Sequence, residues 1–170
     1  MKIKIFLFIL LTIAGHVNSK VDPPNYNFSL DSLSSFLPGG SLKKLKEVHG
    51  DGEVIKKTGE KLTLKYNIAQ LRYKFPVLVV VENGKVLDFY ATLPTYFVHD
   101  LFHQSLINRY KKQNLFRKYE GTSLYMWKTD KLILTYAATC TITCFPLYLT
   151  GSDPAVTESL QQMISTGLLK

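Results

Sequence analysis

The hydrophobic and polar positions alternate between two periods along the chain. A short helical period and then a strand-like alternation occur between Ser41 and Leu93, and the same order recurs between about Gln104 and Thr150. Apolar residues three or four apart are typical of a helix with one buried side, whereas alternate positions are typical of a strand with one buried face. The pattern predicts an α+β protein made of two similar helix-plus-antiparallel-sheet units with a C-terminal helix.

Several helices have recognisable start and stop signals. A short helix over residues 30–36 stops at Pro38-Gly39-Gly40, and Ser41 can cap the next one because its hydroxyl accepts from an N–H group of the first turn. The apolar stripe of that second helix is Leu42, Leu45 and Val48. Pro94-Thr95 opens the longest helix, with a stripe of Val98, Leu101, Phe102, Ser105, Leu106 and Arg109. A final helix is expected to begin at Ser152-Asp153-Pro154 and to end at Gly167.

Strands are expected in both units. Asn83-Gly84 is the strongest turn signal in the chain, because both residues tolerate a positive φ. The strands of the first unit are expected at residues 54–57, 62–66, 75–81 and 85–93. Those of the second are expected at residues 115–119, 123–128, 132–136 and about 145–150.

The N-terminus has the features of an export signal. Lys2 and Lys4 precede an apolar run over residues 5–14, and Val17-Asn18-Ser19 supplies small residues for cleavage. The run is too short to span a membrane, although an uncleaved anchor is the alternative. We expect a periplasmic or secreted protein without a membrane span after removal of residues 1–19. The rest divides into a linker with a short helix (20–35), the first unit (36–94) and the second unit with the C-terminal helix (95–170).

The chain is basic, with a formal charge of +8. Lysines and arginines come in short groups, at 43–46, 56–57 and 109–112. Such groups suit an anionic partner, for example an acidic protein, a lipid headgroup or a cell-wall polymer. Export argues against nucleic acid. Solvated helix and strand faces explain these groups more simply than any specific anion site.

Cys140 and Cys144 have two alternative arrangements. In one continuous strand they would lie ~13 Å apart at ~3.3 Å per residue, too far for a disulfide, which needs Cα atoms within ~7 Å. If residues 141–143 form a tight loop, the two cysteines face each other and can pair. An exported protein meets an oxidising compartment, so we favour the disulfide. Two thiols without a histidine nearby in the sequence predict no zinc site.

His99 and His103 are spaced i, i+4 on the expected long helix. That spacing can hold zinc, and the string His99-Asp100-Leu101-Phe102-His103 is similar to His-Glu-x-x-His. No third ligand is evident, and the apolar neighbours suit a core, so a structural histidine pair is favoured over a metal-dependent hydrolase. The sequence contains no nucleophile elbow and no phosphate-binding loop. We therefore expect no catalytic residue, no metal and no cofactor.

Residues 36–93 resemble the SmpA/OmlA family of small envelope proteins. The resemblance rests on the Pro38-Gly39-Gly40 cap, the helix that ends at Gly50-Asp51-Gly52, a strand at residues 61–66, and the turn at Asn83-Gly84 after an apolar strand. In tandem, this unit implies the fold of the β-lactamase-inhibitor protein. Gly52 stands where the family has a proline, and the lipoprotein cysteine is missing, so the resemblance does not extend to outer-membrane anchoring.

Strand alternation predicts an aromatic binding surface. With Leu124 and Met126 facing the helices, the free face of the sheet would carry Tyr90, Tyr125, Trp127 and Tyr148, with Lys65 and Asp88 among them. Tyrosine and tryptophan are favoured interface anchors. Two alternatives are that the chain's own N-terminal segment or C-terminal helix covers this face, and that a one-residue slip exchanges the two faces.

The sequence as a whole predicts an exported, non-catalytic module of the bacterial envelope, such as a protein inhibitor, that binds another protein through this aromatic face. The first alternative is an envelope-assembly or cell-wall-associated scaffold whose lysines bind an anionic polymer. The second is a metal-dependent hydrolase centred on His99 and His103. The third is a structural module without an exposed aromatic face.

Overall fold

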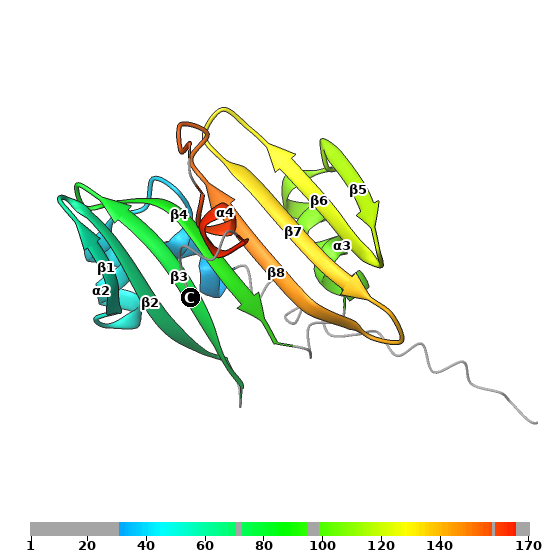
Figure 1. Ribbon diagram of the computed structural model, residues 1–170, viewed down its shortest axis with the longest axis horizontal. Helices are drawn as coiled ribbons and strands as arrows, with labels where there is room; N and C mark the ends of the chain where they lie inside the picture. Colours follow the sequence, from blue (N-terminus) through cyan, green and yellow to red (C-terminus); the bar gives the residue numbers. More distant parts are fainter. Residues whose placement is uncertain (1–30, 71–72, 95–98, 158, 166–170) are drawn as a thin grey trace, which may run out of the picture.

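The computed structural model describes residues 31–70, 73–94, 99–157 and 159–165 (Figure 1). The fold is α+β, with one eight-stranded antiparallel sheet in the order β1-β2-β3-β4-β8-β7-β6-β5. The strands are β1 (Glu53–Thr58), β2 (Lys61–Gln70), β3 (Tyr73–Glu82), β4 (Lys85–Leu93), β5 (Leu115–Tyr119), β6 (Thr122–Lys128), β7 (Ile133–Cys140) and β8 (Cys144–Ser152). The helices are η1 (Ser34–Phe36), α2 (Leu42–His49), α3 (His99–Tyr110) and α4 (Leu160–Ser165).

Several local predictions are confirmed. The bounds of β4 and β5 are as predicted. The backbone N–H of Lys44 donates to the Ser41 hydroxyl over 3.1 Å, so Ser41 caps α2. Asn83 and Gly84 have φ values of 49° and 73° in the turn between β3 and β4. The predicted export signal and the linker up to residue 30 lie outside the described residues.

Other boundaries differ from the prediction. β2 continues to Gln70, because Tyr66 and Ile68 keep the alternation with buried side chains and β3 pairs along the whole length. The last helix begins at Leu160 and not near Ser152, because β8 extends to that residue and Asp153 accepts from the N–H of Ala155 in a turn. Val48 was expected on the buried stripe of α2 but is 58% exposed. Within the described residues no helix combines the length and the apolar character needed to cross a membrane.

The two faces of the sheet are covered differently. Helices α2 and α3 lie on one face, the helical face, and α4 lies on the opposite face, the open face, against β3 and β4 (Figure 1). The main core lies between the sheet and the helical-face elements and includes Phe36, Leu45, Val77, Phe89, Leu106, Leu134 and Leu147. A second, small cluster on the open face is formed by Val80 and by Leu160 of α4, and Ile55, Leu78, Leu87 and Tyr90 pack against it.

Tyr125 and Trp127 lie on the helical face, so the prediction that they point outward is wrong. Trp127 is 2% exposed and Tyr125 is 9% exposed. The reason is the packing of α3 on this face, where the His103 ring lies against the Tyr125 ring with the centroids 3.9 Å apart. Phe102, Ser105 and Leu106 of the same helix are also buried, so α3 packs on the face of β6 and β7 that carries Tyr125, Trp127 and Tyr136 and covers their rings. The indole N–H of Trp127 donates to the Lys111 carbonyl over 2.8 Å, which satisfies its one polar atom.

The junction between β4 and β8 depends on a close approach of a ring to a backbone. Phe89 is opposite Gly151 in the β4–β8 pairing. A Cβ atom at Gly151 would collide with the Phe89 ring, which is fully buried. Glycine at this position therefore allows the ring to lie across the neighbouring strand.

We expect Gly151→Ala to destabilise the protein by about 1–3 kcal/mol, because a buried ring cannot move aside without disturbing the core. Denaturant unfolding of Gly151→Ala, Phe89→Leu and the double variant measures the effect. The double variant should lose less stability than the two single variants lose together, because leucine at position 89 does not collide with the Cβ atom at position 151. Strict additivity would show that the collision is not the cause.

Trp127 is the only tryptophan of the chain, so its emission reports on the helical-face core. We expect blue-shifted emission in the folded protein, with a red shift on unfolding. Trp127→Ala should destabilise the fold by about 3–5 kcal/mol because it leaves a large cavity, and Trp127→Phe should cost less. Emission typical of a solvated indole in the folded protein would contradict this placement.

Candidate functional site

The open face brings two of the predicted aromatic residues together. The rings of Tyr90 and Tyr148 lie with their centroids 5.4 Å apart, and both side chains are half-buried. Tyr90 belongs to β4 and Tyr148 to β8, the two strands that pair at the centre of the sheet. The structure thus divides the predicted set of four aromatic residues between opposite faces and leaves this tyrosine pair on the open one.

The tyrosine pair belongs to a wider surface. Lys65, Leu78 and Tyr90 follow one another in register across β2, β3 and β4. Leu124 and Met126 of β6 share this face, which reverses the inward orientation predicted for them. We call the half-buried apolar side chains of this face the apolar band, which consists of Leu78, Tyr90, Leu124, Met126, Ala137 and Tyr148.

Asp88 is not available to a partner, contrary to its predicted binding role. Its side chain is 2% exposed, and its carboxylate accepts from the backbone N–H of Leu160, the first residue of α4. Leu160 packs on Val80, so α4 is fixed over this end of the open face. Burial raises the pKa of Asp88 to about 7, while the N–H groups of Leu160 and Phe89 and the charge of Lys61 act in the opposite direction. Strand alternation placed Asp88 on the same face as Tyr90 but did not indicate that its carboxylate holds α4.

The raised pKa of Asp88 predicts a specific pH dependence. In the unfolded chain this carboxyl ionises near pH 4, whereas in the folded protein it remains protonated up to about pH 7. The folded state therefore binds more protons in this window, so stability falls as pH rises from about 4 to about 7 and changes little above it. We expect the free energy of unfolding of the wild type, measured relative to that of Asp88→Asn, to decrease by a few kcal/mol between these pH values. Each unit by which folding raises the pKa contributes roughly 1.4 kcal/mol.

Urea unfolding of both proteins between these pH values tests this expectation. Asp130→Asn is the matched control, because Asp130 is exposed in the turn between β6 and β7. Its removal should not change how the free energy of unfolding varies with pH. If the free energies of unfolding of the wild type and Asp88→Asn differed by the same amount at all these pH values, Asp88 would be ionised in the folded protein.

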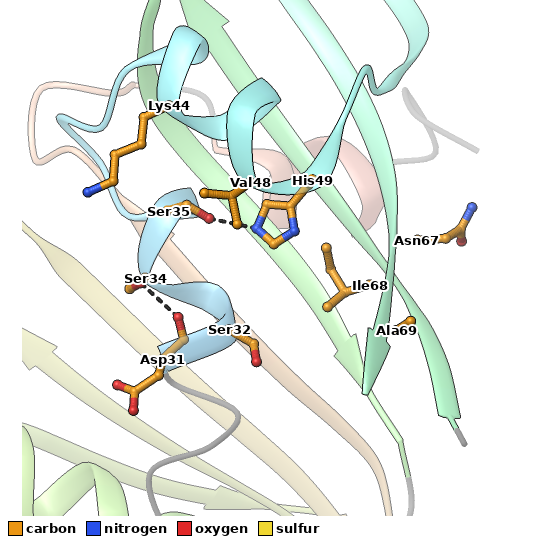
Figure 2. Close-up of a pocket in the computed structure, with 10 residues that line it drawn as sticks. All are labelled: Asp31, Ser32, Ser34, Ser35, Lys44, Val48, His49, Asn67, Ile68 and Ala69. Carbon is orange, nitrogen blue, oxygen red and sulfur yellow. Dashed lines mark hydrogen bonds between the residues drawn. The ribbon is translucent and has the colours of Figure 1, made fainter. Parts of the chain in front are cut away.

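A groove of about 450 Å³ lies on the other side of the sheet (Figure 2). It is lined by Asp31, Ser32, Ser34, Ser35, Lys44, Val48, His49, Asn67, Ile68 and Ala69. Nε2 of His49 lies 2.8 Å from the Ser35 hydroxyl oxygen. A serine and a histidine at this distance have the geometry of a nucleophile and its base.

The environment of His49 favours a structural role. Its ring stacks on Phe36 with the centroids 4.8 Å apart, and burial lowers its pKa, which keeps the imidazole neutral. No carboxylate among the described residues forms a hydrogen bond or ion pair with His49 that would orient it as a base. The Ser35–His49 hydrogen bond thus joins η1 to α2, in the same way that Arg109 and Asp31, 2.9 Å apart, join α3 to the segment before η1.

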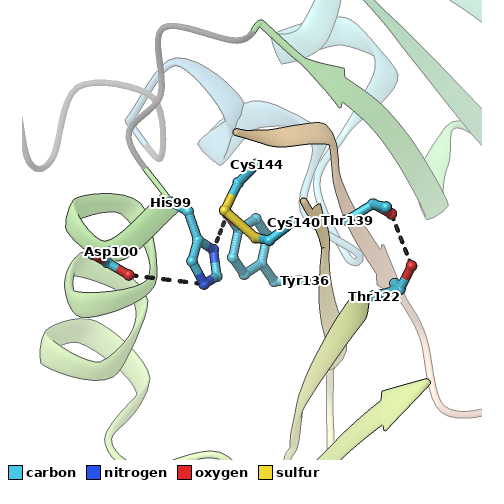
Figure 3. The surroundings of a disulfide bond; sticks show 7 residues. All are labelled: His99, Asp100, Thr122, Tyr136, Thr139, Cys140 and Cys144. Carbon is cyan, nitrogen blue, oxygen red and sulfur yellow. Dashed lines mark hydrogen bonds and ion pairs between the residues drawn. A yellow bond between two sulfur atoms is a disulfide. The ribbon is translucent and has the colours of Figure 1, made fainter. Parts of the chain in front are cut away.

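His99, the first residue of α3, lies next to a disulfide bond (Figure 3), and His103 follows one turn later on the same helix. Their rings are nearly parallel, with an angle of 2° and centroids 5.9 Å apart, so the pair does not converge on one point as the two histidines of a zinc hydrolase do. Cys140 and Cys144 form a disulfide between the ends of β7 and β8. One ligand atom each from His99, Cys140 and Cys144 lie within 4.8 Å of one another. His99 is therefore distant from the two cysteines in the sequence but close to them in space.

Comparison with known proteins identifies no family. No family model matches the chain, and no curated protein matches it. A solved structure that matches is the DUF4309 family protein YjgB from Bacillus subtilis subsp. subtilis strain 168, with 7% identity and a TM-score of 0.44, over 69% of this chain and 80% of that one. The resemblance to the SmpA/OmlA family and to the β-lactamase-inhibitor protein is therefore wrong. At this identity and TM-score, the match to YjgB carries no functional argument.

Proposed function

We propose that this chain is an exported, non-catalytic module of the bacterial envelope that binds an acidic surface of another protein through the apolar band of its open face. The observation that carries the proposal is the tyrosine pair, Tyr90 and Tyr148, at the centre of this band. Half-buried tyrosines give an interface large contact area at little cost in side-chain entropy. A contiguous apolar surface on a sheet is typical of an interaction site.

We further propose that the sheet consists of two tandem units. Each unit would comprise one helix followed by four strands that pair in sequence, α2 with β1 to β4 and α3 with β5 to β8. The last strands of the units, β4 and β8, pair with each other, and each supplies one tyrosine of the pair. This arrangement supports a rigid docking surface, because the centre of the sheet is hydrogen-bonded on both sides.

The charges around the apolar band support an acidic partner. The basic residues Lys74, Arg117 and Lys128 are exposed on strands of the sheet, whereas Lys65, in the row of Tyr90, is paired with the exposed Glu53 across β1 and β2. Asp88, which follows Leu87 and precedes Tyr90's neighbour Phe89 on β4, is buried, and its carboxylate accepts from the N–H of Leu160. Basic side chains at the rim of an interface increase the rate of association with an acidic surface.

Site-specific photo-crosslinking in the native envelope tests the docking surface. We expect a benzophenone amino acid in place of Tyr148 to crosslink to a discrete partner, whereas the same amino acid in place of Phe116 should not. Phe116 is the matched control, because it is an aromatic residue that is 49% exposed and contacts Tyr125 of the helical face. Equal crosslinking from both positions would contradict docking through the open face.

The partner identified in this way allows a quantitative measurement. Tyr148→Ala should weaken its binding by about 2 kcal/mol or more, as expected of an anchor residue, while Phe116→Ala should leave it nearly unchanged. The scaffold alternative predicts the opposite dependence. Binding to an anionic polymer would be lost at high ionic strength and would not depend on Tyr148, whereas apolar docking is screened much less.

A further inference from the structure

The disulfide at the tip of the β7–β8 hairpin lies beside a histidine that belongs to a distant part of the sequence. His99 begins α3, whereas Cys140 and Cys144 close the loop of residues 141–143. Figure 3 shows the His99 ring directed toward the disulfide. One nitrogen of His99 and the two sulfur atoms lie within 4.8 Å of one another. A tetrahedral zinc ion, with Zn–S bonds of about 2.3 Å, holds two thiolate sulfurs about 3.8 Å apart, so these atoms need only small displacements to surround one ion.

We propose that reduction of the Cys140–Cys144 disulfide converts this cluster into a site for one zinc ion, with the two thiolates and the His99 imidazole as ligands. The fourth position of the tetrahedron would hold water or an exogenous ligand. The disulfide and the zinc site exclude each other, because sulfur atoms bonded to one another carry no negative charge. The hairpin thus has two covalent states, of which one binds metal.

The chemistry of the three groups fits zinc. A Cys-x₃-Cys spacing lies within the range found in zinc sites, and sulfur with imidazole nitrogen is a donor set that zinc favours. Nδ1 of His99 lies 3.0 Å from the Tyr136 hydroxyl, which holds the ring in its present orientation. A neutral imidazole has a nitrogen lone pair to donate to a metal ion. Two thiolates and Zn²⁺ also give a site without net charge, which suits a half-buried position.

The reaction balances with a dithiol as the reductant. The dithiol supplies two electrons and two protons, the S–S bond breaks, two cysteine thiols form and the reductant closes its own disulfide. Zinc binding then displaces the two thiol protons to solvent. The loop can accommodate the separation of the sulfur atoms because Thr141, Ile142 and Thr143 are exposed, with Ile142 fully so.

Zinc titration of the full chain tests the proposal. Protein that has been reduced with a phosphine and freed of oxygen should bind one Zn²⁺ per chain by elemental analysis, and Co²⁺ in its place should give a thiolate-to-cobalt charge-transfer band. Oxidised protein should bind none. His99→Asn should weaken binding to the reduced chain by about tenfold or more. Absence of binding to the reduced chain, or equal binding to the oxidised chain, would overturn the proposal.

His103→Asn is the matched control, because His103 lies on the same helix and packs on the same aromatic residues but is not one of the three ligands. It should bind zinc like the wild type, and loss equal to that of His99→Asn would assign the effect to the fold of α3. A measurement on the wild type alone avoids this ambiguity. Zinc should slow alkylation of both cysteines in the reduced chain, and unchanged alkylation rates would refute the site.

Discussion

The hydrogen-bonded pairing of β4 with β8 is the interaction on which the rest of the structure depends. It joins strands that are distant in the sequence and makes one sheet of eight strands, in which β1 and β5 form the edges. Each four-stranded half would otherwise expose its last strand as an unpaired edge, which is prone to association with other chains. Phe89 and Gly151 make the junction compact, because the ring occupies the space that a side chain at residue 151 would fill.

A continuous sheet also gives the two faces different environments. Helices α2 and α3 precede the strands of their own half and pack on the helical face, where large rings such as Tyr136 and Trp127 are almost fully buried. The open face has α4 at one end, held by the carboxylate of Asp88 and by Leu160. The histidine–disulfide cluster belongs to the helical side and the tyrosine pair to the open side, so the two proposed activities use different surfaces.

Local signals in the sequence were sufficient to predict most strands and the outward side of Tyr90 and Tyr148, but not the faces of β6. Asn83-Gly84, Ser41 and the alternation along β4 each act through neighbouring residues, so their positions were predicted correctly. The orientation of Trp127 depends on what α3 presents across the core, and no residue near Trp127 in the sequence carries that information. A shift of one residue in a strand exchanges all its side chains between faces, and this error placed Trp127 and Tyr148 on one surface.

Contacts between distant segments account for the remaining differences. The proximity of His99 to Cys144 arises only when the hairpin of β7 and β8 returns beneath the start of α3, and the burial of Asp88 arises only when α4 docks. The edges of the sheet show a related constraint that the sequence does express, since β1 contains Lys56 and Lys57 and β5 contains Arg117 and Lys118. Charged side chains on exposed edge strands oppose pairing with a further strand. With both edges protected in this way, a partner is more easily accommodated on the open face than by extension of the sheet.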